Sequence, residues 1–276
     1  MTYELSVCVN DISERSYATQ SALHFATQNK SHLTAVYIKI DEVQIRRWAS
    51  SAPLSMAKQM LKDQDERECD AKLLFESLAK NHGCSTTWKT VNQSDSPFIQ
   101  MMCTDYIFVS QPVNDDFSHR PDDQFITDLL LQTKRPIILI PNGWRKTQLA
   151  KNIVIGWNDS TIAMRAVADA VPLLRNARHV NVLKIIKKHR FSEQLVSTSP
   201  DIKTYLEAKG INSTLLVQAD EKNTGDAKEL LNFANNDNSD LIVIGGYSHS
   251  RFREVFFGGV TKQVLTESTV PVLVTH

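Results

Sequence analysis

Short apolar runs alternate with amphipathic stretches along this chain. Residues 5–9 form the first apolar run, and the stretch after it carries Ala18, Ala22, Leu23 and Ala26 at helical spacing. A short apolar run between turn signals is typical of a buried strand, whereas apolar residues three and four positions apart predict a helix. Strands that alternate with helices indicate a parallel, doubly wound α/β sheet.

The alternation predicts five strands in each half of the chain. The predicted strands span residues 5–9, 33–40, 85–91, 106–109 and 136–140 in the first half, and residues 153–156, 180–186, 212–218, 241–244 and 270–274 in the second. Predicted helices include residues 122–133, 160–174, 226–235 and 260–267. The predicted fold class is therefore α/β, with two tandem doubly wound (Rossmann-like) domains that each contain a five-stranded parallel sheet flanked by helices.

The two halves are copies of one unit. Residues 105–110 resemble residues 240–245, and Pro136 corresponds to Pro271 at the same offset of 135 residues. A repeat of this length indicates a duplicated domain rather than a short repeat of a solenoid.

The starts of the two halves also correspond. Asn10-Asp11 matches Asn158-Asp159 at an offset of 148 residues, so the first copy holds about a dozen extra residues before its middle strand. We place the two domains at residues 1–147 and 148–276.

Bulk composition excludes several classes of protein. The chain has 276 residues, a formal net charge of zero and no apolar run near the roughly 20 residues that cross a bilayer. These properties argue against nucleic acid and against a membrane as partners. The four cysteines follow no zinc or disulfide spacing, so we expect buried structural thiols. The first residues show no signal pattern, and the expected location is the cytoplasm.

The last thirty-odd residues, from Asp240 onward, contain the strongest candidate site. The predicted strand 241–244 ends in Gly245-Gly246, a short basic loop follows, and Gly258-Gly259 precedes the next helix. Free backbone N–H groups and the helix dipole make such a turn a candidate phosphate site. The alternative is a tight turn and a helix start without any ligand.

On these residues the chain resembles the universal stress protein family in its tandem form, over essentially its whole length and most strongly in the last forty residues. Nucleotide-binding members of that family have a loop of the form Gly-two residues-Gly-nine residues-Gly-Ser/Thr. The resemblance puts Gly245 at the first glycine, Ser248 at the second, Gly258 at the third and Gly259 at the Ser/Thr position.

The resemblance also implies where a nucleotide would lie. The family places an aspartate near adenine and ribose at the end of the first strand, which is Asn158 here, and a backbone contact to adenine late in the second strand, which is Ile185 here. The implied ligand is ATP or another adenine nucleotide (ADP or AMP), with or without magnesium. The candidate nucleotide-binding residues are Asn158, Ile185, Gly245, Ser248, His249, Ser250, Gly258, Gly259, Val260 and Thr261.

Three of these positions depart from the family pattern. Ser248 replaces a glycine, Gly259 replaces a hydroxyl residue, and Asn158 replaces the aspartate. Trp157, next to Asn158, either lines a base pocket or packs in the core.

The first half departs much further. Gly245-Gly246 becomes Ser110-Gln111, and Gly258-Gly259 becomes Asp123-Gln124. Carboxylates at the place of phosphate oxygens repel a triphosphate. The first half is therefore predicted to be a degenerate domain without a phosphate site.

The resemblance implies a stress-response protein that binds its nucleotide in the second half and acts as a sensor or adaptor for an unknown protein partner. No catalytic residues and no metal ligands are predicted. One alternative is a nucleotide-free interaction scaffold, and another is a slow ATPase or phosphate-transferring enzyme. Because dimers of the family pair their final strands, residues 136–140 and 270–274 are expected to pair within the chain as an intramolecular pseudo-dimer.

Overall fold

We analysed a computed structural model of the chain. It describes residues 2–9, 16–39, 45, 54–111, 123–187, 201–220, 224–246 and 259–276, and all structural statements refer to these residues.

Strands and helices alternate in both halves. The first half contains β1 (Glu4–Cys8), α1 (Tyr17–Asn29), β2 (His32–Lys39), α3 (Leu54–His82), β3 (Ser85–Asn92), the 3-10 turns η2 (Gln93–Asp95) and η3 (Pro97–Met101), β4 (Tyr106–Ser110), α4 (Asp123–Thr133) and β5 (Ile137–Ile140). The second half contains β6 (Asn152–Trp157), α5 (Thr161–Leu174), β7 (His179–Lys187), α7 (Ile202–Ala208), β8 (Thr214–Asp220), α8 (Asp226–Asn236), β9 (Leu241–Gly245), α9 (Gly259–Glu267) and β10 (Val272–Thr275).

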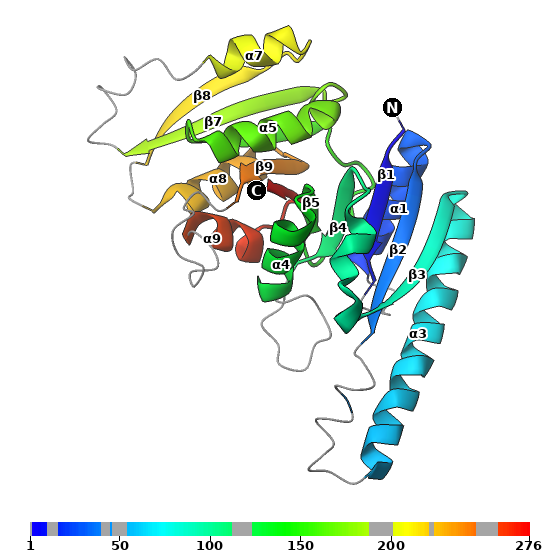
Figure 1. Cartoon of the computed structure of the whole chain (residues 1–276). Coiled ribbons are helices and arrows are strands. Elements are labelled where there is room, and N and C mark those ends of the chain that lie inside the picture. Colours follow the sequence, from blue (N-terminus) through cyan, green and yellow to red (C-terminus); the bar gives the residue numbers. More distant parts are fainter. Residues whose placement is uncertain are drawn as a thin grey trace.

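All ten strands form one continuous sheet, in the order β3-β2-β1-β4-β5-β10-β9-β6-β7-β8 (Figure 1). Each half contributes five strands that pair in parallel, as the sequence predicts. Only the central pair, β5 with β10, is antiparallel. Antiparallel pairing of two equivalent strands relates the halves by a pseudo-twofold axis, so the expected pairing of the final strands is confirmed.

The junction between the halves is fully buried. Ile138 lies opposite Leu273, and Leu139 lies opposite Val272. All four side chains are buried. Short apolar edge strands attract other strands when they are unpaired, and here each one covers the other.

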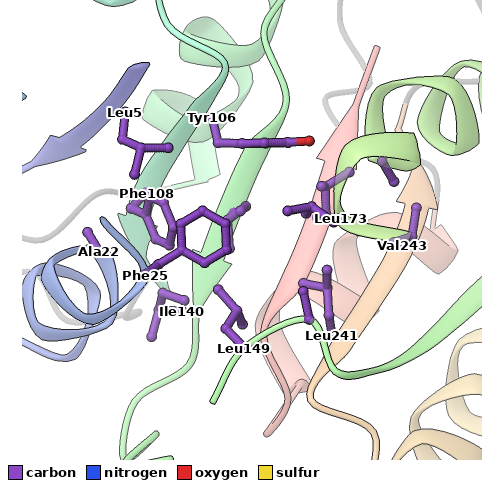
Figure 2. Close-up of a cluster of buried hydrophobic side chains, with 14 of the residues drawn as sticks. Leu5, Ala22, Phe25, Tyr106, Phe108, Ile140, Leu149, Leu173, Leu241 and Val243 are labelled. Carbon is purple, nitrogen blue, oxygen red and sulfur yellow. The ribbon is translucent and has the colours of Figure 1, made fainter. Parts of the chain in front are cut away.

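Helices cover both faces of the sheet. We call the face that α1, α3, α5 and α7 cover the α5 face, and the face that α4, α8 and α9 cover the α8 face. The core on the α5 face continues across the junction, from Leu5 and Phe108 in the first half to Leu173 and Leu241 in the second (Figure 2). The two halves therefore share apolar cores as well as a sheet.

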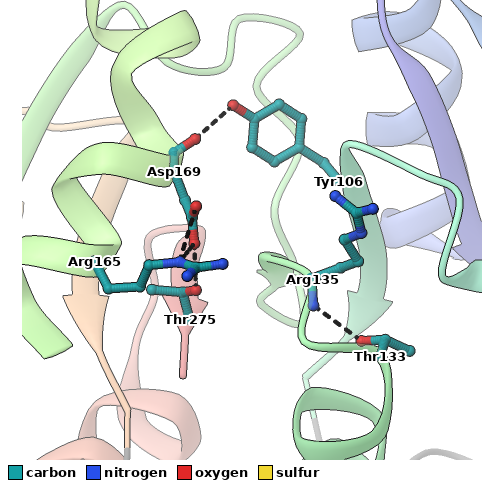
Figure 3. Close-up of polar contacts among 6 residues, drawn as sticks. All are labelled: Tyr106, Thr133, Arg135, Arg165, Asp169 and Thr275. Atoms are coloured by element: carbon teal, nitrogen blue, oxygen red, sulfur yellow. Dashed lines mark hydrogen bonds and ion pairs between the residues drawn. The ribbon is translucent and has the colours of Figure 1, made fainter.

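Polar contacts also cross the junction (Figure 3). The Tyr106 hydroxyl donates to the backbone oxygen of Asp169 at 2.9 Å. The Asp169 carboxylate accepts from the Thr275 hydroxyl at 2.6 Å and pairs with Arg165 one helical turn away. These contacts tie α5 to β4 of the first half and to the final strand of its own half.

The repeat is visible in individual hydrogen bonds. Asp105 accepts from the Glu4 N–H at 2.9 Å, and its counterpart Asp240 accepts from the N–H groups of Lys151 and Asn152 at 2.8 and 3.0 Å. Burial raises the pKa of the Asp240 carboxyl above its ordinary value. In both halves an aspartate just before the fourth strand (β4 or β9) thus binds the start of the first strand, which explains why this residue appears in both copies.

The copies differ in length at two places. The strand registers define equivalent residues of the two halves, and the offset is the difference between their residue numbers. This offset is 147 for the pair His32 and His179, and it falls to 127 for the pair Thr87 and Thr214. It returns to 135 at Asp105 and Asp240. The first half therefore has about twenty more residues around α3, which extends past the sheet in Figure 1, and about eight fewer where α8 follows β8.

The expectation of four buried thiols is wrong for two cysteines. Cys8 is buried, and burial raises the pKa of its thiol to about 12. Cys84 is half-buried, but Cys69 and Cys103 are exposed. Cys69 lies on the long α3 helix, where few side chains reach the core. No helix among the described residues has the length and apolar character of a membrane span.

Candidate functional site

Three strand ends of the second half meet at one edge of the sheet. In the sheet, β6 lies between β9 and β7. The chain continues from β6 to β7, its neighbour on one side, and later returns to β9, its neighbour on the other side. Trp157 pairs with Lys184 on β7, and the register of β6 with β9 brings Gly245 to the same level. This reversal of strand order is the switch point at which doubly wound sheets bind ligands.

The chain leaves β6 through a tight turn. Asn158 is exposed, and its side-chain oxygen accepts from the Ser160 backbone N–H at 3.3 Å and from the Ser160 hydroxyl at 2.7 Å. Ser160 in turn caps α5, because its hydroxyl oxygen accepts from the Ala163 N–H. Asn158 thus stabilises the helix start and presents its amide at the sheet edge.

An ion pair lies beside this turn. The Lys184 ammonium contacts one Asp159 oxygen at 2.5 Å, and the Trp157 indole N–H donates to the other at 2.7 Å. The Lys184 side chain is 11% exposed and that of Asp159 33%. Asp159 has a φ of 57°, in the left-handed region that aspartate tolerates better than most residues. The pair therefore fixes a partly exposed carboxylate at the end of β6.

Trp157 belongs to the core. Its side chain is 4% exposed and packs in the cluster on the α5 face. The core alternative for this residue is therefore confirmed, with the indole N–H as its polar link to Asp159.

Ile185 lies where β7 extends beyond β6. β6 ends at Trp157, opposite Lys184, so no β6 residue lies beside Ile185. On the other side Ile185 pairs with Gln218 of β8. Its side chain packs against the core on the α8 face. The Ile185 side chain therefore faces the α8 face, and its backbone lies beyond the end of β6.

The two glycines after β9 have different neighbours. A Cβ atom on Gly245 would lie 2.6 Å from the Ile162 methyl carbon Cγ2 and 2.7 Å from the Ile162 carbonyl carbon. A Cβ atom on Gly246 would approach Val274 at 3.0 Å. Gly245 is thus required by close packing of β9 against the start of α5, whether or not a ligand binds.

Helix α9 begins next to the end of β9. The Thr261 hydroxyl donates to the Gly245 backbone oxygen at 3.5 Å, and Thr261 is buried. Gly259 and Val260 are exposed, and a Cβ atom on Gly259 would meet nothing within 4 Å. The first two residues of α9 are therefore exposed, and Thr261 of the same turn contacts Gly245. Ser248, His249, Ser250 and Gly258 lie outside the described residues.

The equivalent turn in the first half has a structural role. The Gln111 backbone N–H donates to the Ile140 oxygen at 2.8 Å, as the Gly246 N–H does to the Thr275 oxygen. The buried Gln111 side chain reaches across the junction to the end of α9. Its amide nitrogen lies within 3.0 to 3.1 Å of three backbone oxygens, those of Leu265, Thr266 and Ser268. The Gln111 side chain therefore caps a helix of the other half and links the two halves.

Two of these residues were missed at the sequence level. Lys184 interrupts an otherwise apolar strand, and a charge in a buried strand needs a partner. That signal could have identified it, but only the register of β6 with β7 identifies Asp159 as the partner. Gln111 carries no comparable signal, because its acceptors lie more than 150 residues away.

The site offers hydrogen-bonding groups and little metal-binding capacity. Among the described residues, no group of three His, Cys, Asp or Glu side chains could hold a metal ion. The chemistry available at the edge is therefore an amide, one paired carboxylate, the backbone of β7 and the open start of α9.

Residues 150–276 match the sequence model of the universal stress protein family. No curated protein matches the chain. Among solved structures, the chain is similar to a universal stress protein from Archaeoglobus fulgidus DSM 4304, with 13% identity, coverage of 98% of this chain and 97% of that one, and a TM-score of 0.68. It is also similar to a functionally unknown protein from Pseudomonas aeruginosa PAO1, with 13% identity, coverage of 99% and 92%, and a TM-score of 0.60.

A shorter match is a universal stress protein in complex with cAMP, at 19% identity and a TM-score of 0.39, covering 47% of this chain and 98% of that one. The two long matches show that the whole chain, and not only its second half, has the fold of the Archaeoglobus protein.

Proposed function

We propose that the chain is a tandem member of the universal stress protein family, because residues 150–276 match that family's model and the whole chain shares its fold with the Archaeoglobus protein. We propose further that it binds one adenine nucleotide at the carboxyl edge of its second half. The observation that carries this proposal is the strand register at the switch point. It brings Asn158, Ile185 and Gly245 to one edge of the sheet, next to the start of α9. Open α/β sheets bind their ligands in such a crevice.

The base and the sugar would lie over β6 and β7. The backbone of Ile185 has no β6 neighbour and can exchange hydrogen bonds with an adenine edge. Asn158 and the exposed part of Asp159 would accept hydrogen bonds from ribose hydroxyls. Lys184 compensates the charge of Asp159, so an anionic nucleotide meets a neutral pair there.

The phosphates would lie between the end of β9 and α9. The backbone N–H groups in the first turn of a helix have no intrahelical partner, and the helix dipole favours an anion there. Gly259 leaves that turn open. Any magnesium would be held mainly by the phosphate oxygens, because the Asp159 carboxylate, which lies next to Asn158, is already paired with Lys184.

The bound nucleotide would serve as a signal rather than as a substrate. The hydroxyl groups next to Asn158 and Gly245 have structural partners: the Ser160 hydroxyl bonds Asn158 and caps α5, and the Thr261 hydroxyl donates to the Gly245 backbone oxygen. The proposed role is a sensor or adaptor whose unknown protein partner distinguishes the loaded from the empty form.

One observation favours a nucleotide-free scaffold as the second candidate. Gly245 is required by its contact with Ile162, so part of the glycine pattern has a reason that involves no ligand.

Calorimetric titration of the full chain with ATP, ADP and AMP tests the proposal. We expect saturation at one nucleotide per chain, and we expect Gly258→Asp to abolish binding, because the new carboxylate would precede α9 as Asp123 does in the first half. Asn236→Asp, which adds the same charge at the exposed end of α8, should bind normally.

Absence of saturable binding, together with purified protein that carries no nucleotide, would favour the scaffold. Two nucleotides per chain would contradict the asymmetry between the halves. ADP production by the unaltered protein above the Gly258→Asp background would favour the enzyme alternative.

A further inference from the structure

A second pocket opens at the opposite edge of the second half. It has a volume of about 400 Å³ and lies at the amino ends of β6, β7 and β8, away from the crevice discussed above. Pockets that take small molecules begin at about this size. Its lining is almost entirely polar and consists of Asn152, Arg178, His179, Val180, Asn181, Asn212, Thr214 and Asp237.

The equivalent edge of the first half is closed by its own side chains. His32, the counterpart of His179, is bonded through both ring nitrogens, to Ser85 at 2.9 Å and to Thr87 at 3.0 Å. Ser31, the counterpart of Arg178, is buried and accepts from the Tyr3 N–H. The second half replaces this closed network with an exposed arginine beside an exposed histidine.

Arg178 provides the positive side of the pocket. Its backbone is fixed, because its N–H donates to the Lys151 oxygen at 2.7 Å. Its guanidinium has no hydrogen bond or ion pair to any residue in the described part of the chain, although residues 188–200 and 221–223 lie outside that part. An exposed guanidinium at a pocket wall suits a carboxylate, which it can bind through two N–H groups.

Asp237 provides the negative side. It follows α8, and its carboxylate accepts from the Asn181 side-chain amide at 2.9 Å and from the Ser239 hydroxyl at 3.3 Å. Both donors are neutral groups. The carboxyl end of α8 adds a partial negative charge beside this carboxylate, and cations are stabilised at such a helix end.

We propose that this pocket binds a small zwitterion of the amino-acid class, with its carboxylate on Arg178 and its ammonium group on Asp237. The neutral side chains of Asn152, Asn212 and Thr214 supply donors and acceptors for a polar side chain of the ligand. The proposal does not depend on nucleotide binding, because the two sites lie at opposite edges of the sheet.

The test compares three probes on the full-length protein by calorimetry. L-glutamine carries both charges, glutaramate lacks the ammonium group, and 4-aminobutanamide lacks the carboxylate. L-glutamine is expected to bind at least tenfold more tightly than either analogue. Arg178→Gln and Asp237→Asn should each weaken glutamine binding at least tenfold, and Asp237→Asn keeps an acceptor for Asn181. Lys72→Gln on the exposed side of α3 should change nothing.

Three outcomes would overturn the proposal. They are no saturable binding of glutamine by the folded protein, equal binding of glutaramate, and unchanged glutamine binding in Asp237→Asn. The second would mean a simple anion site on Arg178.

Discussion

The turn after the fourth strand of each half has the same backbone and two different uses. Gln111 and Gly246 make the same N–H hydrogen bond to the neighbouring final strand, at 2.8 Å in both cases. In the first half the Gln111 side chain then crosses the junction and caps α9. In the second half the equivalent residue is Gly246, which has no side chain that could make such a contact.

This difference teaches how a duplicated domain divides its roles. The hydrogen bonds that define the fold occur in both copies. Thr133 accepts from the Arg135 N–H, and Ser268 accepts from the Val270 N–H in the same way. The copies differ at the carboxyl edge, where the Gln111 side chain of the first half caps α9 and the second half has Gly246 at the equivalent position. Under the proposed function, one edge of the joined pair would bind the ligand, and the other edge is then available to stabilise the junction.

This comparison of the two halves assumes that each half needs the other in order to fold. Replacing both Ile138 and Leu273 by aspartate should cause the largest effect, because both side chains are fully buried and face each other in the β5–β10 pair. A buried, unpaired carboxylate costs several kcal/mol, and this variant has two of them. We expect loss of the native circular dichroism spectrum and aggregation in light scattering.

The control for this variant places two aspartates on an edge strand. Leu215 and Val217 of β8 are 40% and 37% exposed, so the double aspartate variant there should remain folded and monodisperse. A compact, soluble Ile138→Asp/Leu273→Asp protein would contradict the pairing.

The two copies should also respond differently at the last residue of the fourth strand. Gly245→Ser would place a Cβ atom 2.7 Å from the backbone of Ile162, and backbone cannot move aside as a side-chain tip can. Overpacking of this kind costs about 3 kcal/mol. The matched change in the first half, Ser110→Gly, should cost less than about 1 kcal/mol. Urea denaturation measures both, and equal losses would show that Gly245 is not constrained by packing.

The sequence could predict what both copies share. The ten strands, the repeated aspartates and the pairing of Pro-led apolar final strands follow from local pattern and from the offset between copies. The positions of Asn158 and Gly245 at one edge also follow, because parallel strands place their carboxyl ends together.

The rest depended on contacts between distant residues. The partner of Lys184 is 25 residues away, and the acceptors of Gln111 belong to the other half. The two exposed cysteines were wrongly expected to be buried, because composition does not reveal which side of α3 carries Cys69 or that Cys103 lies in an exposed turn.

A smaller loss is expected from removing the cap on α9. Gln111→Ala leaves three backbone oxygens without their side-chain donor, and an unsatisfied buried group costs about 1 to 3 kcal/mol, so we expect a loss of about 2 kcal/mol. Gln111→Glu should be worse, since it places a carboxylate against the same oxygens. Gln132→Ala and Gln132→Glu on the exposed side of α4 should change stability little. Thermal unfolding measures the loss of stability in each variant. A Gln111→Ala variant as stable as the unaltered protein would show that Gln111 does not stabilise the junction.

The smallest expected effect is a loss of stability at acidic pH, and it should differ between the two halves. His82 at the end of α3 lies edge-to-face against His24 of α1, with ring centroids 4.7 Å apart. Burial, and then the nearby His24, lower the pKa of His82 below its ordinary value of 6.5. A histidine whose pKa is lower in the folded state binds protons more readily when the chain is unfolded, so stability falls as the pH drops below about 6.5. His82→Asn should remove this part of the slope between pH 7 and pH 5. Lys209→Asn, at the equivalent position of the second half, should shift stability equally at every pH in that range. Urea denaturation at several pH values distinguishes the two, and an unchanged slope in His82→Asn would assign the acid sensitivity to other groups.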